Sequence, residues 1–393
     1  MAEAAARLLR ASSSSAEAAP TVKLISPIAD DPFGEFLLNN ARLSGVHTDG
    51  FFLVNATQAA GSKEGGARTA VCSLTLDHGG DLVQGVADFA ITDAVSSQID
   101  SATGDLRTQG FALHLQAFLD EAIHANSRST SRYGTPPHAV VAFDANLGPA
   151  VIRRIIAHKL SLPEHLRAAS TLLYEPTSLP KCDAALIALA QLREQGHRSP
   201  LIDVCTPNEL EVLRMHAAAR KLDLLQKHSP EVAVAVAVAE GGVEESAVLT
   251  AAAELLACFG IIFLKRGGKG VTLLRRPPTS SVGGFSPIST ASISHHPAPS
   301  TLRAKDIVNT TGAGDTFAGA VLAACAWHGD PAVWDDEMLR DVVSWAQSAS
   351  AATLKAGTAV SPELDRLMTP LSLSLPRQAP ALSSQCIRTP ATK

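Results

Sequence analysis

The sequence predicts an α/β protein in which helices cover both faces of a mostly parallel sheet. Short apolar segments typical of buried strands alternate with helical segments along most of the chain. The chain has 393 residues, 46% of them hydrophobic, which is enough for one large core. The stretch at about 51–93 changes to a period of two and indicates a small sheet apart from the main one.

The first twenty residues allow two interpretations. Their arginines, serines and alanines are typical of organelle targeting peptides, but Glu3 and Glu17 are unusual in such peptides. The alternative is a short helix from Ala2 to Leu9, followed by a serine-rich loop.

The segment TVKLISPIADDPFGEFLLNNARLSGV predicts a strand, a turn and an amphipathic helix. The supporting residues are Leu24 and Ile25 in the strand, Asp30, Asp31 and Pro32 at the helix start, Phe36, Leu37 and Leu43 at helical spacing, and Gly45 at the helix end.

The segments TAVCSLTLD and DLVQGVADFAI flank the turn HGG, whose Gly79 and Gly80 can adopt positive φ, and so predict a β-hairpin. Further along, the run VAVAVAVA at 232–239 suits a strand or a buried helix equally well. The other predicted elements are strands at 139–147, 170–176 and 201–208, a strand, turn and strand at 261–274, and helices that include 182–195 and 244–258.

Two segments are rich in proline and serine, and we expect a flexible insertion at 275–303 and a mobile tail at 367–393. His295 and His296 lie in the insertion, but without nearby cysteine or acidic residues they are a weak indication of a metal site.

Composition excludes several classes of function. The formal net charge of −5 gives no basic face for a nucleic acid polymer, and no apolar run approaches the ~20 residues of a membrane span. The six cysteines form no C-x-x-C pair, and most lie in apolar runs, which indicates buried thiols in a reducing compartment. We therefore expect a cytoplasmic protein, with organellar import as the alternative.

The stretch NTTGAGDTFAGA, from Asn309 to Ala320, carries the clearest chemical signal. Gly312, Ala313 and Gly314 leave the backbone bare where a helix should begin, and bare N–H groups at a helix N-terminus bind anions. Asp315 beside such an anion could accept a proton from an alcohol that attacks phosphorus. The alternative is a tight turn with Asp315 as an ordinary helix cap.

The longer stretch DIVNTTGAGDTFAGAVLAA closely resembles the C-terminal signature of the PfkB/ribokinase family of small-molecule kinases. Similar segments follow the family order over roughly residues 20–365. The resemblance implies a ribokinase-like fold in which about 51–93 form a β lid. It also implies that Asp315 is the catalytic base and that Gly312, Ala313 and Gly314 form the anion hole.

Other positions match the nucleotide side of the family. TPNELE resembles the N-x-x-E segment and implies that Asn208 and Glu211 organise Mg²⁺ at the triphosphate, Glu211 through water; the alternative is a helix-cap pair. KRGGKG resembles the turn against the nucleotide and implies ATP contacts for Lys265, Gly267 and Gly270. SASAATLKAGTAVSP, at 348–362, resembles the helix and loop that border the adenine.

Two softer marks resemble pseudouridine kinases. They are GGDLVQGVADFAIT, which contains Asp88, and YEPTSLPK, which contains Glu175 and Lys181. The resemblance implies substrate contacts for these three residues. The alternatives are an exposed hairpin residue for Asp88 and a solvated charge for Lys181.

The chain departs from the family at its start. The family opens with a strand that carries a substrate-binding aspartate, followed by a Gly-Gly segment, whereas MAEAAARLL looks like the helix after that segment. Two explanations are open: the sequence is an incomplete gene model or a fragment, or substrate binding is weakened.

The function implied is ATP-dependent phosphorylation of a primary hydroxyl on a sugar or nucleoside, with the 5′-OH of pseudouridine as the preferred acceptor. ATP and Mg²⁺ are the implied cofactors, while K⁺ is left open because Asn309 stands where many relatives have aspartate. The implied partner is a small molecule, and a homodimer through the β lid is also left open. The alternatives are a kinase of ribose or adenosine, and a catalytically impaired binding relative.

Overall fold

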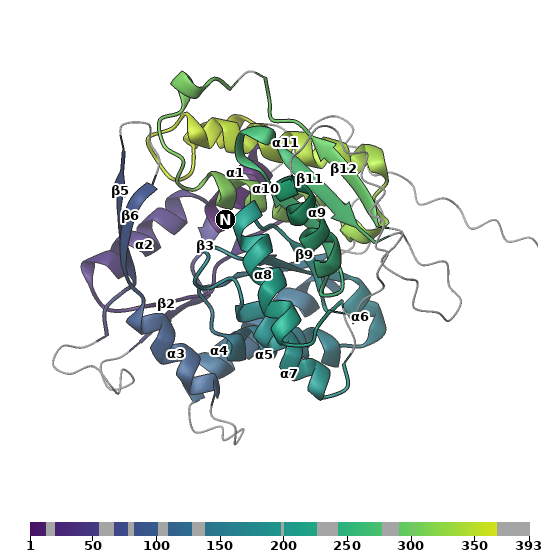
Figure 1. Cartoon of the computed structure of the whole chain (residues 1–393). Coiled ribbons are helices and arrows are strands. Elements are labelled where there is room, and N and C mark those ends of the chain that lie inside the picture. The colour runs from purple at the N-terminus through teal and green to yellow at the C-terminus, as the bar shows by residue number, and fades with distance from the viewer. Residues whose placement is uncertain are drawn as a thin grey trace, which may run out of the picture.

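A six-stranded sheet forms the centre of the molecule (Figure 1). Its spatial order is β12-β11-β10-β9-β8-β7; β7 to β10 are parallel, and β11 and β12 add an antiparallel edge. The strands are β7 (Ala139–Asp144), β8 (Ser170–Glu175), β9 (Ile202–Cys205), β10 (Phe259–Lys265), β11 (Val271–Arg275) and β12 (Ser292–His296). The structure is a computed structural model that describes residues 1–12, 20–54, 67–77, 82–100, 109–127, 138–197, 200–225, 243–276, 291–300 and 302–367.

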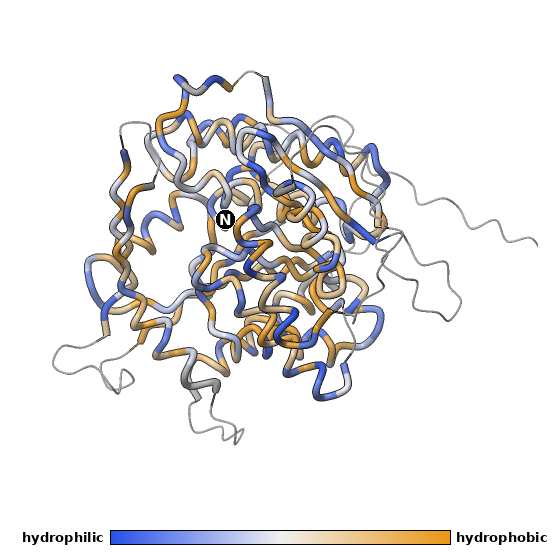
Figure 2. The backbone as a smooth tube through the Cα atoms, viewed as in Figure 1, coloured by the Kyte–Doolittle hydropathy of each residue, from blue (hydrophilic) through white to orange (hydrophobic). Residues whose placement is uncertain are grey.

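Successive residues of the central strands enter two different cores. Leu172 and Ile262 lie in the core on one face of the sheet, whereas Leu173 and Ile261 lie in the core on the other. This alternation explains why the strands read as continuous apolar runs, and it confirms the predicted fold class of a sheet covered on both faces. The hydrophobic segments gather in the interior, as Figure 2 shows.

Two groups of helices supply these cores. The first face is covered by α3 (Ala90–Asp100), α4 (Gln109–Ser127), α5 (Pro149–Ser161), α7 (Ala184–Glu194), α8 (Glu209–Lys221) and α9 (Val243–Leu255). The second face is covered by α1 (Ala2–Ser12), α10 (Ala313–His328), α11 (Asp336–Leu354) and the short helix η5 (Pro362–Arg366). The short helix α6 (Glu164–Ala168) precedes β8.

Helix α1 joins the beginning of the described chain to its end. Ala4, Ala5 and Leu8 are fully buried in the second core, where α1 packs against α10. Two arginines of α1 bind Asp365, and the Nη1 of Arg7 lies 2.6 Å from its carboxylate. The expected helix at the start of the chain is therefore present, and it extends to Ser12.

The predicted strand around Leu24 and Ile25 is wrong in its position. The strands are instead β1 (Val22–Lys23), which pairs in parallel with β3 (Val46–His47), and β2 (Ser26–Ile28), which pairs with β4 (Phe51–Leu53). Two residues separate β1 from β2, whereas three separate β3 from β4. The pairing of β1 with β3 therefore cannot continue in the same register into the pairing of β2 with β4, and the predicted strand is interrupted at Leu24 and Ile25.

The helix predicted after this strand is α2 (Pro32–Leu43), but its expected apolar face does not face a core. Asp31 caps it by accepting from the Gly34 N–H at 2.7 Å, as predicted. However, Phe36 and Leu43 are 70% and 80% exposed, while the small residues Gly34 and Ala41 are buried. A Cβ on Gly34 would lie 2.3 Å from the Ala29 carbonyl, so close backbone packing selects the small face of α2.

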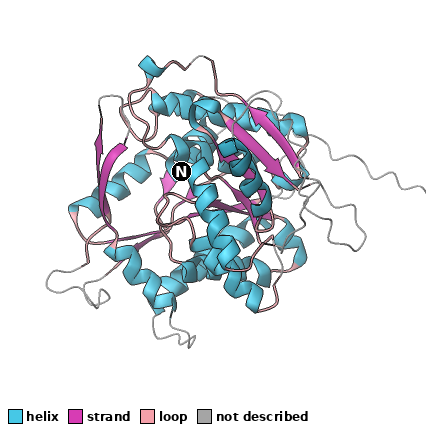
Figure 3. Cartoon of the chain, viewed as in Figure 1, coloured by secondary structure: helices cyan, strands magenta, loops and turns pink. Residues whose placement is uncertain are grey.

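The predicted hairpin is confirmed as an antiparallel pair, β5 (Val71–Leu76) and β6 (Leu82–Asp88), outside the six-stranded sheet. It lies at the left of Figure 3, away from the strands of the main sheet. It is narrower than the expected β lid of 51–93, because Phe51–Leu53 pair with β2 and α3 begins at Ala90. Its role as a lid stays a prediction.

The expected flexible insertion at 275–303 is also partly wrong. Its C-terminal part forms β12, in which His295 pairs with Thr272 and His296 with Val271 of β11. The predictions for Gly79, Gly80, the run at 232–239 and the tail after 367 lie outside the described residues. Among the helices that the structure describes, none combines the length and apolar character needed to cross a membrane.

Candidate active site

The stretch Asn309–Ala320 folds as a tight turn that leads into α10. Gly312 is the N-cap residue with φ of 82°, in the left-handed region that favours glycine. A Cβ on Gly312 would lie 1.9 Å from the Ala359 carbonyl oxygen, so the turn and the loop after α11 are in close backbone contact. No side chain caps the helix. The N–H of Ala313 donates to the Thr310 carbonyl at 3.5 Å, which leaves the N–H groups of Gly314 and Asp315 for another acceptor.

Asp315 lies in the first turn of α10 with its side chain 56% exposed. It is not the N-cap residue, so the alternative of an ordinary helix cap does not describe its position. Its Oδ1 lies 3.7 Å from the amino group of Met1. An accessible carboxylate beside a bare helix N-terminus fits the predicted general base.

Lys265 and Glu175, expected at the nucleotide and at the substrate, form a buried ion pair beside this turn. The Nζ of Lys265 donates to both carboxylate oxygens of Glu175, at 2.8 and 3.0 Å, and the Thr206 hydroxyl donates to one of them. Burial raises the pKa of Glu175 to about 7, against the opposing effect of the Lys265 charge. Burial alone would lower the pKa of Lys265, but the charge and hydrogen bonds of Glu175, together with the nearby carboxylates of Glu211 and Asp315, raise it above its ordinary value. Both oxygens of Glu175 thus have protein partners, and its predicted substrate contact stays a prediction.

A second polar group lies where β7 ends, and it includes two residues that the sequence analysis missed. Asp144 is the last residue of β7, and burial raises the pKa of its carboxyl, with a smaller contribution from Asp315. The Oδ1 of Asn146 accepts from the Nζ of Lys181 at 2.8 Å, and that ammonium lies 3.6 Å from the centre of the Phe89 ring. The motif FDAN at the carboxyl end of a predicted strand could have identified both residues, because ligands of parallel sheets bind there.

Asn208 and Glu211 form a capping box at the start of α8. The Oδ1 of Asn208 accepts from the N–H of Glu211, and the Oε2 of Glu211 accepts from the N–H of Asn208, both at 2.9 Å. Within the described ranges, no group of three or more histidine, cysteine or acidic side chains is arranged to hold a metal ion. The residues therefore provide no direct ligand set for Mg²⁺, and the cap pair that the sequence left open is present.

The predicted nucleotide turn joins β10 to β11 through the short helix η1 (Gly267–Lys269). Gly267 and Gly270 have φ of 56° and 95°, and a Cβ on Gly270 would lie 2.1 Å from the His296 carbonyl oxygen. Arg266, which precedes η1, is bound by Glu209 at 2.8 Å. These contacts fix the turn against α8 and β12. Contacts with ATP stay a prediction.

Asp88 ends the hairpin strand β6. Its Oδ1 accepts from the N–H of Ala90 at 3.1 Å, and its Oδ2 lies 3.6 Å from Arg68. The carboxylate thus helps to start α3, and its substrate role stays a prediction.

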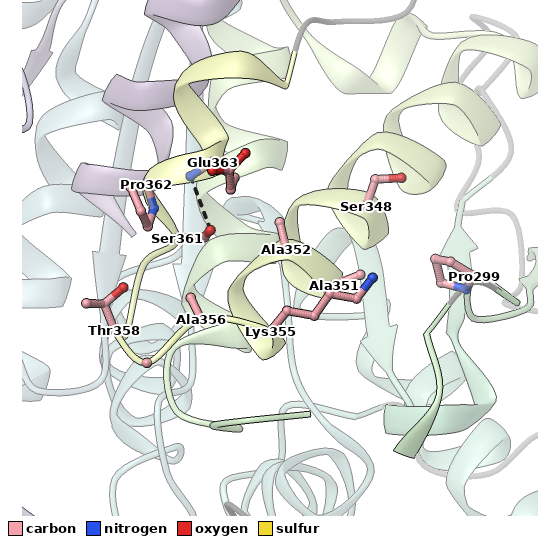
Figure 4. A pocket seen from close by; sticks show the side chains of 11 residues that line it. Pro299, Ser348, Ala351, Ala352, Lys355, Ala356, Thr358, Ser361, Pro362 and Glu363 are labelled. Atoms are coloured by element: carbon pink, nitrogen blue, oxygen red, sulfur yellow. Dashed lines mark hydrogen bonds between the residues drawn. The ribbon is translucent and has the colours of Figure 1, made fainter. Parts of the chain in front are cut away.

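A pocket of about 550 Å³ lies against the C-terminal end of α11 (Figure 4). Ala352, Lys355 and Thr358 line it, and Pro299 contributes from a separate segment. The same loop carries Ala359, which touches Gly312, so the pocket is adjacent to the turn.

Comparison with known proteins gives matches among solved structures alone. No family model matches the chain, and no curated protein matches it. The solved structures similar to it include a ribokinase from Giardia lamblia, at 13% identity and a TM-score of 0.55, covering 94% of this chain and 87% of that one. The fold is ribokinase-like. The predicted fold class is thereby confirmed.

Two further solved structures have the same fold. An adenosine kinase from Sinorhizobium meliloti has 12% identity and a TM-score of 0.54, with 93% of this chain and 80% of that one covered. A ribokinase from Arabidopsis thaliana, complexed with ribose and ATP, has 14% identity and a TM-score of 0.53, with 95% and 85% covered. At such low identity the ribokinase-like fold is what these structures establish.

Proposed function

We propose that this protein transfers the γ-phosphoryl group of MgATP to a primary hydroxyl of a sugar or nucleoside. The observation that carries the proposal is the exposed carboxylate of Asp315 in the first turn of α10, beside an uncapped helix N-terminus at Gly312. A base next to an anion site is what attack of an alcohol on a phosphoryl group requires.

In the proposed reaction, the hydroxyl oxygen of the acceptor forms a bond to the γ-phosphorus, and the bond from that phosphorus to the bridging oxygen of ADP breaks. Asp315 accepts the hydroxyl proton, and ADP leaves with the bond electrons. The N–H groups that follow Gly312 stabilise the charge that develops on the phosphoryl oxygens. Mg²⁺ enters with the triphosphate as part of the substrate, because the described residues form no direct ligand set for it.

We place the nucleoside part of ATP in the pocket beside Ala352 and Lys355. Three features support this: its volume of about 550 Å³, its apolar alanine wall, and its position on the loop whose Ala359 lies against Gly312. The turn at Gly267–Lys269 would then lie along the phosphates, as its resemblance implies.

We place the acceptor at the carboxyl ends of β7 and β8, where Asp144, Asn146 and Lys181 gather. Hydroxyl groups of a sugar suit the carboxylate and the amide, and a base with several carbonyl oxygens suits the ammonium. Pseudouridine meets both requirements and is the acceptor we propose. The structural likeness to ribokinases and to an adenosine kinase makes ribose and adenosine the acceptors to compare.

The test is transfer from MgATP to a panel of pseudouridine, uridine, adenosine and ribose, followed by mass spectrometry of the product and coupled detection of ADP. We expect pseudouridine 5′-phosphate as the main product. Lys181→Met should raise the KM for pseudouridine, whereas Lys221→Met, at an exposed lysine at the end of α8, should not. Transfer to none of the four, with intact MgATP binding, would favour a binding relative.

A further inference from the structure

We propose that Lys265 binds the transferred phosphoryl group beside Gly314, and that Glu175 and Thr206 hold its ammonium in that position. The proposal rests on the proposed kinase function and adds a side-chain cation to the backbone anion site. It narrows the ATP contact expected for Lys265 to the transferred group, and it gives Glu175 a positioning role in place of the substrate contact expected from the sequence.

The first argument is where the ammonium lies. A Cβ built on Gly314 would lie 3.2 Å from the Nζ of Lys265. In a helix every Cα–Cβ bond tilts toward the N-terminus, so this space opens toward the first turn of α10. Lys265 therefore places its charge beside the N–H groups of the proposed anion hole.

The second argument is electrostatic. The N-terminal end of a helix carries a partial positive charge, so a cation there is unfavourable unless an anion is bound. Lys265 is nevertheless held there with its side chain 15% exposed, and its partner Glu175 is 7% exposed. Glu175 offsets the charge of the ammonium, and a bound phosphoryl group would neutralise the positive potential that remains at the helix end. The absence of a side chain at Gly314 leaves room for that group.

The third argument is the hydrogen-bond inventory of the ammonium. Nζ has three donors, and its contacts in the described part of the chain use two of them, both on Glu175. Thr206 donates to Glu175 in turn, and the backbone N–H of Lys265 donates to the Pro207 carbonyl at 2.8 Å. The lysine is thus fixed at its backbone and at its tip, with one donor left for the phosphoryl group.

The chain offers a matched control. Lys159 on α5 forms the same kind of pair, with its Nζ 2.5 Å from Asp203 and its side chain 11% exposed. Asp203 is the second residue of β9, whereas Thr206 follows the end of that strand, so this pair lies toward the other end of the sheet. Loss of either lysine removes a largely buried ammonium from an ion pair, but of the two only Lys265 adjoins Gly314, and Asp203 is more exposed than Glu175.

The experiment measures binding of the non-hydrolysable analogue AMP-PNP and of ADP, both with Mg²⁺, by calorimetry. We expect Lys265→Met to weaken AMP-PNP about 10- to 100-fold, the size of a lost charge-assisted hydrogen bond, and ADP less than about 3-fold. Lys159→Met should leave the ratio of the two affinities unchanged, and Lys265→Arg should restore part of it. The turnover number of Lys265→Met should fall by about 100-fold or more.

The double variant Lys265→Met/Glu175→Gln removes both charges, so it keeps the test valid if the single variant unfolds. Equal weakening of AMP-PNP and ADP, or an unchanged ratio in the folded double variant, would overturn the role of Lys265. Binding with a changed ratio but no transfer to any acceptor would contradict the proposed function and leave the role of Lys265 supported. If the unaltered chain bound neither nucleotide, both proposals would be wrong.

Discussion

The turn before α10 and the hairpin β5–β6 are built in opposite ways. The turn is enclosed: Gly312 has no room for a Cβ against Ala359, and the residues after Asp315 are buried. In the hairpin, β5 and β6 pair only with each other among the described strands, and Val83 and Val86 on β6 are 66% and 64% exposed. Packing therefore fixes the backbone of the turn before α10, whereas the hairpin leaves apolar side chains exposed that another surface could contact.

Removal of the Asp315 carboxylate is the change that should affect function most. Asp315→Asn should lower turnover by about 10²–10⁴-fold, because it removes the proton acceptor, and should leave MgATP binding within a few-fold. Steady-state kinetics and calorimetry on the same preparation measure both quantities. Turnover within about 3-fold of the unaltered chain would show that Asp315 is not the base.

The tightness of the turn can be tested with two glycines of the phosphate side. Gly312→Ala should lower the free energy of unfolding by at least ~1–3 kcal/mol, because it places a Cβ at positive φ and against the Ala359 carbonyl. Gly268→Ala, which has open space around its Cβ position, should change it by less than ~0.5 kcal/mol. Urea denaturation compares the two, and equal effects would break the contrast between enclosed and open positions.

Acid should loosen the main sheet rather than the hairpin. Burial lowers the pKa of His138, before β7, and of His328, at the end of α10, to about 4. Both imidazoles are neutral in the folded chain and become charged on unfolding below pH 6.5, so stability present above pH 6.5 is lost as the pH falls toward 4. In the double variant His138→Gln/His328→Gln, the free energy of unfolding should depend less on pH over this range. Hydrogen exchange that accelerates first in β5–β6 would contradict this order.

The smallest effect is expected in the hairpin. Val86→Thr exchanges a methyl for a hydroxyl on a side chain that is 64% exposed, so the free energy of unfolding should change by less than ~0.5 kcal/mol. A matched Val204→Thr change in β9, at a fully buried position, should reduce it by roughly 1–3 kcal/mol. Comparable losses at both positions would show that the hairpin is packed as tightly as the sheet.

The same difference explains what could be predicted from the sequence. Apolar strands such as 170–176 and the helix start at Asp31 were predictable because local pattern and capping agree with the fold. The exposed face of α2 was not, because the contact of Gly34 with the Ala29 carbonyl depends on a segment outside the helix. At the candidate site, the glycines around Gly312 were enough to predict the turn. The pairing of Glu175 with Lys265 joins residues 90 positions apart, and no local pattern signals it.

The packing of α1 has a consequence for how the chain folds during synthesis. Besides the nearby strands β1 and β3, its buried face packs against α10 and its arginines bind Asp365, and these last two partners are made more than 300 residues later. At about 5–20 residues per second, roughly 15–60 s separate the emergence of α1 from that of α10. Contacts of α1 with β1 and β3 can form early, but the part of its apolar face that packs against α10 stays uncovered throughout that time. We therefore expect nascent chains shorter than about 313 residues to expose an apolar helix that a chaperone can bind.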